Sequence, residues 1–409
     1  MIQPIEAVWR DEWGRLLALL VAQTRRLDLA EDALADAFER AARTWPEAGT
    51  PDNPPAWLLT AARRRVLDRL RAEAVAARKQ PLLAVEEQGG ERADDVLRLV
   101  LLAAHPSLSE EAGAALTLRL VLGISTADIA RLFLVPEPTM AARLTRARKK
   151  VVAAGVPLAI PDDDVLPQRL ETVARVAYLA FTAGYAPGSG ADVVRADLAG
   201  EAIRLVRLVR ATGRAAAGNA ALTALLALML LQHARRDARV DADGGLVLLP
   251  AQDRSGWHRS EIDEGLMLLA ELTGTRGAAV DSALAAEYVL QALIAAEHAR
   301  AARAQETDWL AIADYYRQLE DLTGSPVVRL NRAVAVAEAG DLGNALGLLD
   351  GLDEALPHSH RLPAVRAELL SRAGRHTEAA AAYDVALERC ENEPEHAQLR
   401  ARRSALRLT

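Results

Sequence analysis

Apolar residues recur every three or four positions through most of this chain, which is the spacing of one face of an α-helix. Residues 5–24 place Trp9, Trp13, Leu16, Leu17 and Leu20 on one such face. A second helix is predicted over residues 28–44, and its Asp28-x-x-Glu31 start resembles a capping box. A third is predicted from Asn53 to about residue 74, with proline at its first position. The pattern predicts a three-helix domain over residues 1–78.

Residues 93–154 form a second predicted domain, which ends in two helices of unequal length. Ser125 caps a short helix over residues 126–133, and a tight turn at residues 134–136 leads into a longer basic helix over residues 137–151. This order is typical of a helix-turn-helix, although an ordinary helical hairpin remains as an alternative. Linkers are predicted on either side of the domain, at residues 79–92 and 155–168.

The remaining residues, 169–409, are predicted to be helical except near Asp243-Gly244, where a turn is flanked by short extended pieces. Gly340 and Gly374 occupy matching places in two similar segments, 34 residues apart. That spacing is typical of tetratricopeptide (TPR) helix pairs and predicts TPR-like repeats at about residues 327–395. Two copies are too few for independent stability, so they must pack on the preceding helices.

Composition fits an all-α fold. Of 409 residues, 51% are hydrophobic but only 4% are aromatic, and the apolar share is mainly alanine and leucine. Both residues favour helices. Residues 220–231 are almost entirely apolar, but they are shorter than the ~20 residues of a membrane span and predict a buried helix. With no signal-peptide pattern and a single cysteine, the sequence predicts a cytoplasmic protein without a membrane partner.

Charge separates the two parts of the chain. Residues 1–155 carry 22 basic and 21 acidic residues, whereas the rest of the chain carries a net charge of −8. Two basic clusters lie on predicted helices: Arg63, Arg64, Arg65, Arg69 and Arg71, then Arg143, Arg146, Arg148, Lys149 and Lys150. Such clusters are either solvated helix faces or phosphate-binding surfaces.

No catalytic constellation is recognisable in the sequence. The segment 241–244 resembles part of a calcium loop, but Arg239 and Pro250 would occupy its ends and cannot be ligands. His233 and His258 lack partners at metal-ligand spacing, and Cys390 has no histidine nearby. We therefore expect no enzyme, catalytic residue, metal or cofactor; an enzyme hidden in residues 160–409 has nothing in its favour.

Several segments resemble extracytoplasmic-function (ECF) sigma factors. Residues 28–38 are similar to the polymerase-contacting helix of that family, residues 54–70 to its −10-reading helix, and residues 123–130 and 139–148 to its −35-reading helix-turn-helix. Residues 192–198, 225–231, 233–239 and 252–257 resemble the extension of a subgroup with a TPR-like C-terminal domain. The resemblance implies an alternative sigma factor that binds core RNA polymerase and directs promoter recognition and transcription initiation.

The resemblance also implies three groups of site residues. Near the −10 element these are Asn53, Arg63, Arg64, Arg65, Arg69 and Arg71. Near the −35 element they are Thr139, Met140, Arg143, Arg146, Lys149 and Lys150. Core polymerase would meet Asp28, Glu31, Asp32, Asp36 and Phe38.

The chain departs from the family pattern in the helix-turn-helix. Leu134 stands where the family usually has glycine, and Ala141 and Ala142 replace polar base readers, which implies weak −35 specificity. The loop over residues 45–53 is the candidate pocket for a flipped base, and Trp57 is expected in the core. The acidic C-terminal domain is expected to regulate or support activity, with a protein partner or ligand on its repeats. The alternative is a helix-turn-helix regulator with a helical effector domain, which leaves the acidic second helix unexplained.

Overall fold

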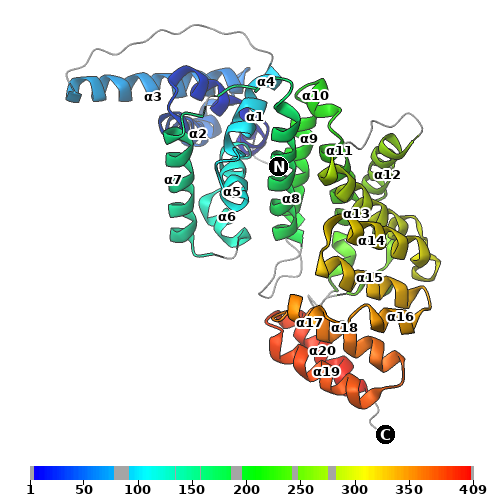
Figure 1. Cartoon of the computed structure of the whole chain (residues 1–409). Coiled ribbons are helices and arrows are strands. Elements are labelled where there is room, and N and C mark those ends of the chain that lie inside the picture. Colours follow the sequence, from blue (N-terminus) through cyan, green and yellow to red (C-terminus); the bar gives the residue numbers. More distant parts are fainter. Residues whose placement is uncertain are drawn as a thin grey trace. The chain divides into compact units, whose positions relative to one another are not determined.

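The computed structural model of the chain (Figure 1) describes residues 4–77, 92–133, 135–156, 158–185, 196–241, 247–274 and 282–406. Every regular element in these ranges is a helix, which confirms the predicted all-α class. The chain divides into two compact units. Unit 1 comprises residues 1–180 and 204–219, and unit 2 comprises residues 181–203 and 220–409.

Unit 1 begins with three helices, α1 (Pro4–Thr24), α2 (Leu27–Ala48) and α3 (Pro54–Ala77), each packed on the other two. Their shared core contains the fully buried side chains of Trp13, Leu16, Leu17, Leu34 and Leu58. The predicted capping box is wrong: α2 begins at Leu27, Arg26 makes no side-chain cap, and Glu31 bonds to arginines far along the chain. Helix α2 also ends later than predicted. Pro46 removes only one backbone hydrogen bond and does not end the helix, which continues to Gly49 (φ +84°).

Four further helices form the second domain: α4 (Arg92–Ala103), α5 (Glu110–Leu120), α6 (Thr126–Leu132) and α7 (Glu137–Ala153). Ser125 caps α6 as predicted, since its Oγ accepts a hydrogen bond from the backbone of Asp128 (3.1 Å) and donates one to the Asp128 carboxylate (2.6 Å). Helix α7 packs on both α5 and α6, which gives the helix-turn-helix arrangement. Leu134 lies outside the described residues.

The next helices are α8 (Leu166–Tyr185), α9 (Ala196–Arg210) and α10 (Arg214–Ala217). The first part of α8 belongs to unit 1: Arg169 donates to the backbone oxygen of Leu101 (2.5 Å), and Arg175 lies 3.4 Å from Glu110. Arg204 of α9 likewise donates to the backbone oxygen of Arg10 (2.5 Å). Unit 1 therefore includes pieces of the predicted C-terminal extension.

Unit 2 is organised around α11 (Ala220–His233), which packs on α12 (Arg259–Thr273) and α13 (Ala283–Arg300). Every residue of α11 except Gln232 is buried, so the prediction of a buried helix is confirmed. The contact is close at Gly265, where a Cβ would lie 2.9 Å from Leu231. Within the residues described, no helix is both long and apolar enough to span a membrane.

Where the connections of unit 2 are described, they contain four short 3₁₀ helices: η1 (Arg236–Arg239), η2 (Leu249–Ala251), η3 (Arg254–Gly256) and η4 (Ala304–Glu306). Arg254 donates hydrogen bonds to the backbone oxygens of His298 and Ala301, both at 2.7 Å, and lies over the ring of Trp257. This side chain fixes the end of α13. The predicted turn at Asp243-Gly244 lies outside the described residues.

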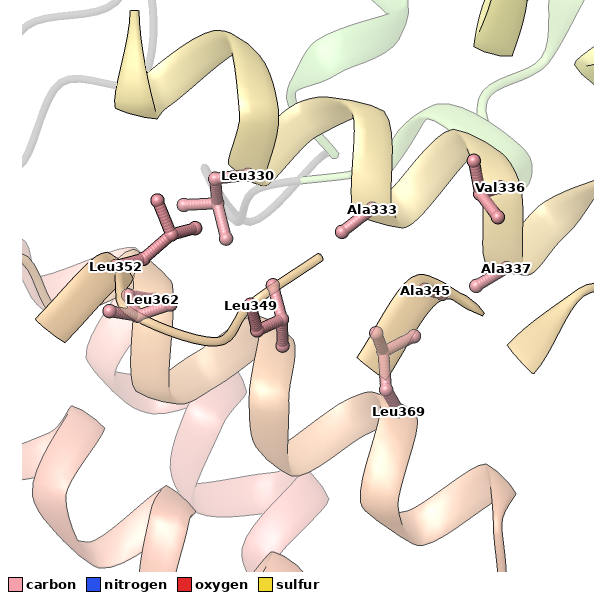
Figure 2. Close-up of a cluster of buried hydrophobic side chains, with 9 residues drawn as sticks. All are labelled: Leu330, Ala333, Val336, Ala337, Ala345, Leu349, Leu352, Leu362 and Leu369. Atoms are coloured by element: carbon pink, nitrogen blue, oxygen red, sulfur yellow. The ribbon is translucent and has the colours of Figure 1, made fainter. Parts of the chain in front are cut away.

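The C-terminal part continues with α14 (Trp309–Thr323), α15 (Pro326–Glu338), α16 (Leu342–Gly347), α17 (Leu352–Ala355), α18 (Arg361–Arg372), α19 (His376–Arg389) and α20 (Glu393–Ala405). Helix α15 packs on α14, α16 and α18, and α19 packs on α18 and α20. Figure 2 shows the buried cluster that joins α15 to α16, α17 and α18, in which Leu330 of α15 and Leu362 and Leu369 of α18 take part.

The two predicted repeats have matching turns. Gly340 and Gly374 both adopt positive φ, +101° and +75°, after α15 and α18. Each turn makes the same three backbone hydrogen bonds, and the bond from Asp341 to Val336 corresponds to the bond from Arg375 to Leu370. A left-handed glycine at this position ends one helix and lets the next begin.

The stability of unit 2 is expected to fall in weak acid because of His298. Burial, with the charges of Arg235 and Arg254, lowers the pKa of His298 from 6.5 to about 4. Between these pH values the unfolded chain takes up a proton that the folded chain does not, so unfolding becomes easier by up to about 3 kcal/mol as the pH falls. In His298→Gln, hydrogen exchange of α13 should show a weaker pH dependence than in wild type. A matched His376→Gln variant should keep the wild-type dependence, and an unchanged profile in His298→Gln would refute this assignment.

Candidate nucleic-acid interface

The first basic cluster lies on the surface of α3. Asn53 caps this helix, since its Oδ1 accepts a hydrogen bond from the backbone of Ala56 (3.2 Å). All five arginines of the cluster are exposed. Arg63 donates to Gln23 (3.1 Å) and Arg65 pairs with Asp36 of α2 (2.5 Å). Exposed pairs of this kind contribute little stability, so these arginines can exchange their partners for phosphates.

The last two arginines of the cluster have partners on their own helix. Arg69 lies 3.7 Å from Glu73, and Arg71 lies 3.5 Å from Asp68. Both arginine side chains remain more than 60% exposed, so neither contact removes them from solvent. The arginines of the α3 cluster are thus all open to solvent, with acids that reduce the local charge in the free protein.

A hollow of about 350 Å³ lies beside this surface. It is lined by Arg40, Ala56, Trp57, Thr60, Ala61 and Arg64. Trp57 is half-buried: its ring meets Trp45 edge-on (5.6 Å), and the Arg40 guanidinium lies 5.8 Å from its centroid. No residue of the predicted loop 45–53 lines this hollow, and Trp45 belongs to the longer α2; a base pocket in that loop stays a prediction.

The second basic cluster lies on α7. Thr139, Arg146, Lys149 and Lys150 are exposed. Arg143 is half-buried, since it lies 3.4 Å from Glu111 and 6.0 Å from the ring centre of Phe133. Met140 is fully buried in the core of the helix-turn-helix, which corrects its predicted role: it can position α7 but cannot contact a base.

The acidic positions of α2 fall into two groups. Asp28, Asp32 and Asp36 reach solvent. Burial would raise the pKa of Asp28, but the Leu29 backbone N–H and the Arg26 guanidinium outweigh it and lower that pKa. Glu31 and Phe38 are buried at 5% and 2% exposure. The prediction that these two contact polymerase is therefore corrected for this conformation, in which Phe38 packs on Trp9.

Glu31 joins the two predicted DNA-reading domains. Its carboxylate accepts hydrogen bonds from Arg119 of α5 and Arg148 of α7, both at 2.7 Å. Both arginines are more than two-thirds buried. Arg119 also donates to the backbone oxygen of Ile124 (3.2 Å), which fixes the turn before α6. One carboxylate thus pairs with two cations from the other domain.

Two glycines allow the same domains to approach closely. A Cβ on Gly14 of α1 would lie 2.5 Å from the backbone oxygen of Val121. A Cβ on Gly123 (φ +69°) would lie 2.7 Å from Trp9 Nε1. We call the packing of α1 and α2 on α5 and α7 through Glu31, Gly14 and Gly123 the closed arrangement. No local pattern in the sequence indicates it, because its residues are far apart along the chain.

The sequence shows no partner at metal-ligand spacing for His233 or His258, but in the fold each lies beside one carboxylate. His233 lies 3.0 Å from Glu261, which also accepts hydrogen bonds from Arg236, and His258 lies 2.7 Å from Asp237. Burial would raise the pKa of Glu261, but the hydrogen bond from His233 and the nearby charges outweigh it and lower that pKa. The contacts of His233 and Arg236 with Glu261 tie the end of α11 to α12.

The prediction that Cys390 has no histidine nearby is also wrong. The side chains of His360, Cys390 and Glu395 place one ligand atom each within 4.8 Å of the others. The helices α18, α19 and α20 bring them together, which no short spacing in the sequence could indicate.

Comparisons with known proteins agree with this geometry. Residues 10–75 match the family Sigma-70 region 2, and residues 98–151 match the family Sigma-70, region 4. Residues 169–273 match a family of unknown function, DUF6596. An uncharacterized protein of Rhizobium meliloti (strain 1021) is 39% identical over 396 residues, which cover 94% of this chain and 91% of that protein. No solved structure matches the chain.

The two Sigma-70 regions account for both basic helices and for the acidic helix. They bind core RNA polymerase and promoter DNA, and sigma-factor families are non-enzymatic regulators. A helix-turn-helix regulator of another class would explain only the second domain and is not favoured. The chain belongs to the ECF-type sigma factors, carries a C-terminal extension, and acts as an alternative sigma factor that directs promoter recognition.

Proposed function

We propose that the exposed acids of α2 (Asp28, Asp32 and Asp36) dock core polymerase while the arginines of α3 and the basic face of α7 follow promoter DNA. The observation that carries this division is the exposure of both basic surfaces on separate domains. Phosphate contacts of this kind supply affinity and register rather than sequence. The protein acts in the cytoplasm with the polymerase and catalyses no reaction itself. Region 2 covers residues 1–78 and region 4 covers residues 93–154.

The test is run-off transcription with the full chain and purified core polymerase on the protein's own upstream DNA. The expected result is a discrete transcript that is absent with core polymerase alone. Asp32→Asn should weaken co-purification with core polymerase, whereas Glu264→Gln, an acid of α12 in unit 2, should not. A chain that binds DNA but neither brings down polymerase nor yields a transcript would instead be a DNA-binding regulator.

The hollow beside α3 is the proposed place for an unpaired −10 base. Trp57 offers an aromatic face at its wall, and Arg40 and Arg64 supply hydrogen-bond donors. Extruding a base costs a few kcal/mol, which stacking and hydrogen bonds can offset. In this proposal Trp57 both packs on Trp45 and stacks on the base. Trp57→Leu should therefore reduce promoter opening while leaving duplex binding at α7 unchanged.

Promoter binding requires the closed arrangement to open. The −10 and −35 elements are about 25 base pairs apart, or about 85 Å along straight DNA. A compact protein domain with as many residues as unit 1 has a diameter of only about 40 Å. Regions 2 and 4 cannot reach both elements while Glu31 holds them together. We infer that the closed arrangement is the resting form and that polymerase and promoter stabilise an open one.

Gly14→Ala is expected to shift this balance toward the open form. Its new methyl group would clash with the Val121 backbone, and overpacking of this kind costs about 1–3 kcal/mol. Core polymerase should then bind about 10-fold more tightly, because less free energy is needed to open the closed arrangement. Gly343→Ala in α16 is the matched control, since its Cβ would meet only Asp341 Oδ1 at 3.9 Å. Equal affinity of Gly14→Ala and wild type would argue against a closed resting form.

The C-terminal helices α15–α19 are proposed to be TPR-like and to regulate or support initiation. The matching turns at Gly340 and Gly374 support this, as does a groove of about 490 Å³ lined by residues of α15, α18 and α20. Val327, Leu330, Val334 and Leu369 supply apolar lining, and paired charges such as Glu338–Arg372 (2.6 Å) stand at the edge. We propose that an extended peptide segment of a regulatory protein binds here.

The groove proposal is tested by blocking it. Val327 is 46% exposed within the groove, whereas Leu310 is 73% exposed elsewhere and does not line it. Val327→Arg should change the transcript yield in the presence of cell extract, and Leu310→Arg should not. The same yield from both variants would contradict a partner at this groove.

A further inference from the structure

The single cysteine of the chain lies in a cluster of three different donor groups. His360 precedes α18, Cys390 follows α19, and Glu395 lies in the first turn of α20. Their ligand atoms are all within 4.8 Å of one another, and His360 Nε2 is 2.7 Å from Glu395 Oε2. We propose that these three side chains bind a single divalent transition-metal ion of the zinc class.

The donor set suits that class of ion. Zinc binds thiolate, imidazole and carboxylate at about 2.0–2.3 Å in tetrahedral geometry, whereas calcium and magnesium require oxygen ligands throughout. Ligand atoms around such an ion stand about 3.3–3.7 Å apart. To bind the ion, the imidazole nitrogen and the carboxylate oxygen, now 2.7 Å apart, would therefore have to move apart by less than about 1 Å. The thiol sulfur would move inward by a similar amount. A water molecule would complete the tetrahedron.

The backbone holds two of these donors in place. Asn392, which is 8% exposed, caps α20 by accepting a hydrogen bond from the backbone of Glu395 (3.0 Å). The backbone oxygen of Asn392 accepts from the backbone of His396 (2.8 Å) and lies 3.5 Å from the Cys390 sulfur. The turn that presents Cys390 and Glu395 is thus formed before any ion arrives, which lowers the cost of assembling the site.

The local charges permit an ion at this place. A thiolate and a carboxylate together balance a divalent cation, and His360 binds as a neutral ligand. Arg361 lies 3.8 Å from Glu395, but its side chain is 64% exposed and can move into water. Because His360, Arg361 and Glu395 also line the groove, a bound ion would fix one end of it by linking α18 to the α19–α20 turn.

The test uses cobalt(II) and zinc with the full-length protein. Cobalt(II) bound to a thiolate gives a charge-transfer absorption band, and we expect one ion per chain with this band, displaced by zinc. Cys390→Ser should abolish the band. His360→Gln and Glu395→Gln should weaken binding by at least about 10-fold, which is the lower limit for loss of even an outer-shell partner.

The control is His376→Gln, a histidine of α19 outside the cluster, which should bind cobalt(II) as wild type does. Glu395→Gln keeps the length of the side chain and the Asn392 cap, so its circular dichroism should be unchanged and its weaker binding cannot come from misfolding. Cobalt(II) bound without a thiolate band, or with equal affinity by wild type and the His360 and Cys390 variants, would overturn the proposal. So would an absence of binding by the wild-type chain.

Discussion

Replacing Glu31 with glutamine is expected to lower the free energy of unfolding of unit 1 by about 3 kcal/mol. Its side chain is 6% exposed and holds Arg119 and Arg148 at 2.7 Å each. Breaking a buried ion pair by removing one partner costs about 3–5 kcal/mol, and the partial exposure of both arginines places this change at the lower end. Hydrogen exchange of α2 and α5 in the full chain measures the loss.

Asp32→Asn provides the matched control for Glu31→Gln. Asp32 lies next to Glu31 on α2 but is exposed, so its loss should change stability by less than about 0.5 kcal/mol. A double-mutant cycle with Arg148→Met should show that the two changes are not additive, because they remove the same pair. If Glu31→Gln and Asp32→Asn were equally mild, the closed arrangement would not depend on this carboxylate.

The triple replacement of Arg146, Lys149 and Lys150 by alanine is expected to reduce affinity for duplex DNA by about 100-fold at low salt. All three side chains are exposed on α7, and no ion pair with the described residues engages them. Removing one cation that neutralises a phosphate should reduce the slope of log affinity against log salt by about 0.9, and removing all three should reduce it by about 2.7. A salt titration with labelled duplex DNA checks both the affinity and the slope.

The control for the triple variant removes the same charge elsewhere. Arg259, Arg303 and Arg375 are exposed in unit 2, so their joint replacement by alanine changes the net charge equally. Affinity and salt slope should remain near wild type. If this control lowered them as much as the α7 variant, DNA would be responding to total charge and α7 would not be its binding face.

The local features of the fold could be predicted from the sequence because their causes are local. The Ser125–Asp128 cap of α6 depends on residues three positions apart, and the turns at Gly340 and Gly374 each depend on one glycine with positive φ. The buried α11 followed from a run of apolar residues. In each case the residues that determine the structure are neighbours in the chain.

The errors concern residues whose partners are distant in the sequence. Glu31 looked like a capping acid, but its partners lie 88 and 117 positions away. Met140 stands on a helix whose other residues suit DNA, and only the packing of α7 on α5 and α6 shows that it faces inward. Cys390 meets His360 through the packing of α18 on α19. The hydrophobic periodicity of a helix shows which of its faces is buried, but it does not show which other helix packs on that face.

The division of the chain has a consequence for its synthesis. Unit 1 contains residues 204–219, so the promoter-binding half is incomplete until the ribosome has added residues well past region 4. At about 5–20 residues per second, the interval between residues 154 and 219 lasts roughly 3–13 seconds. During that time regions 2 and 4 exist without the helix that Arg204 anchors to Arg10. A nascent chain could therefore meet polymerase before Arg204 has anchored α9 to Arg10.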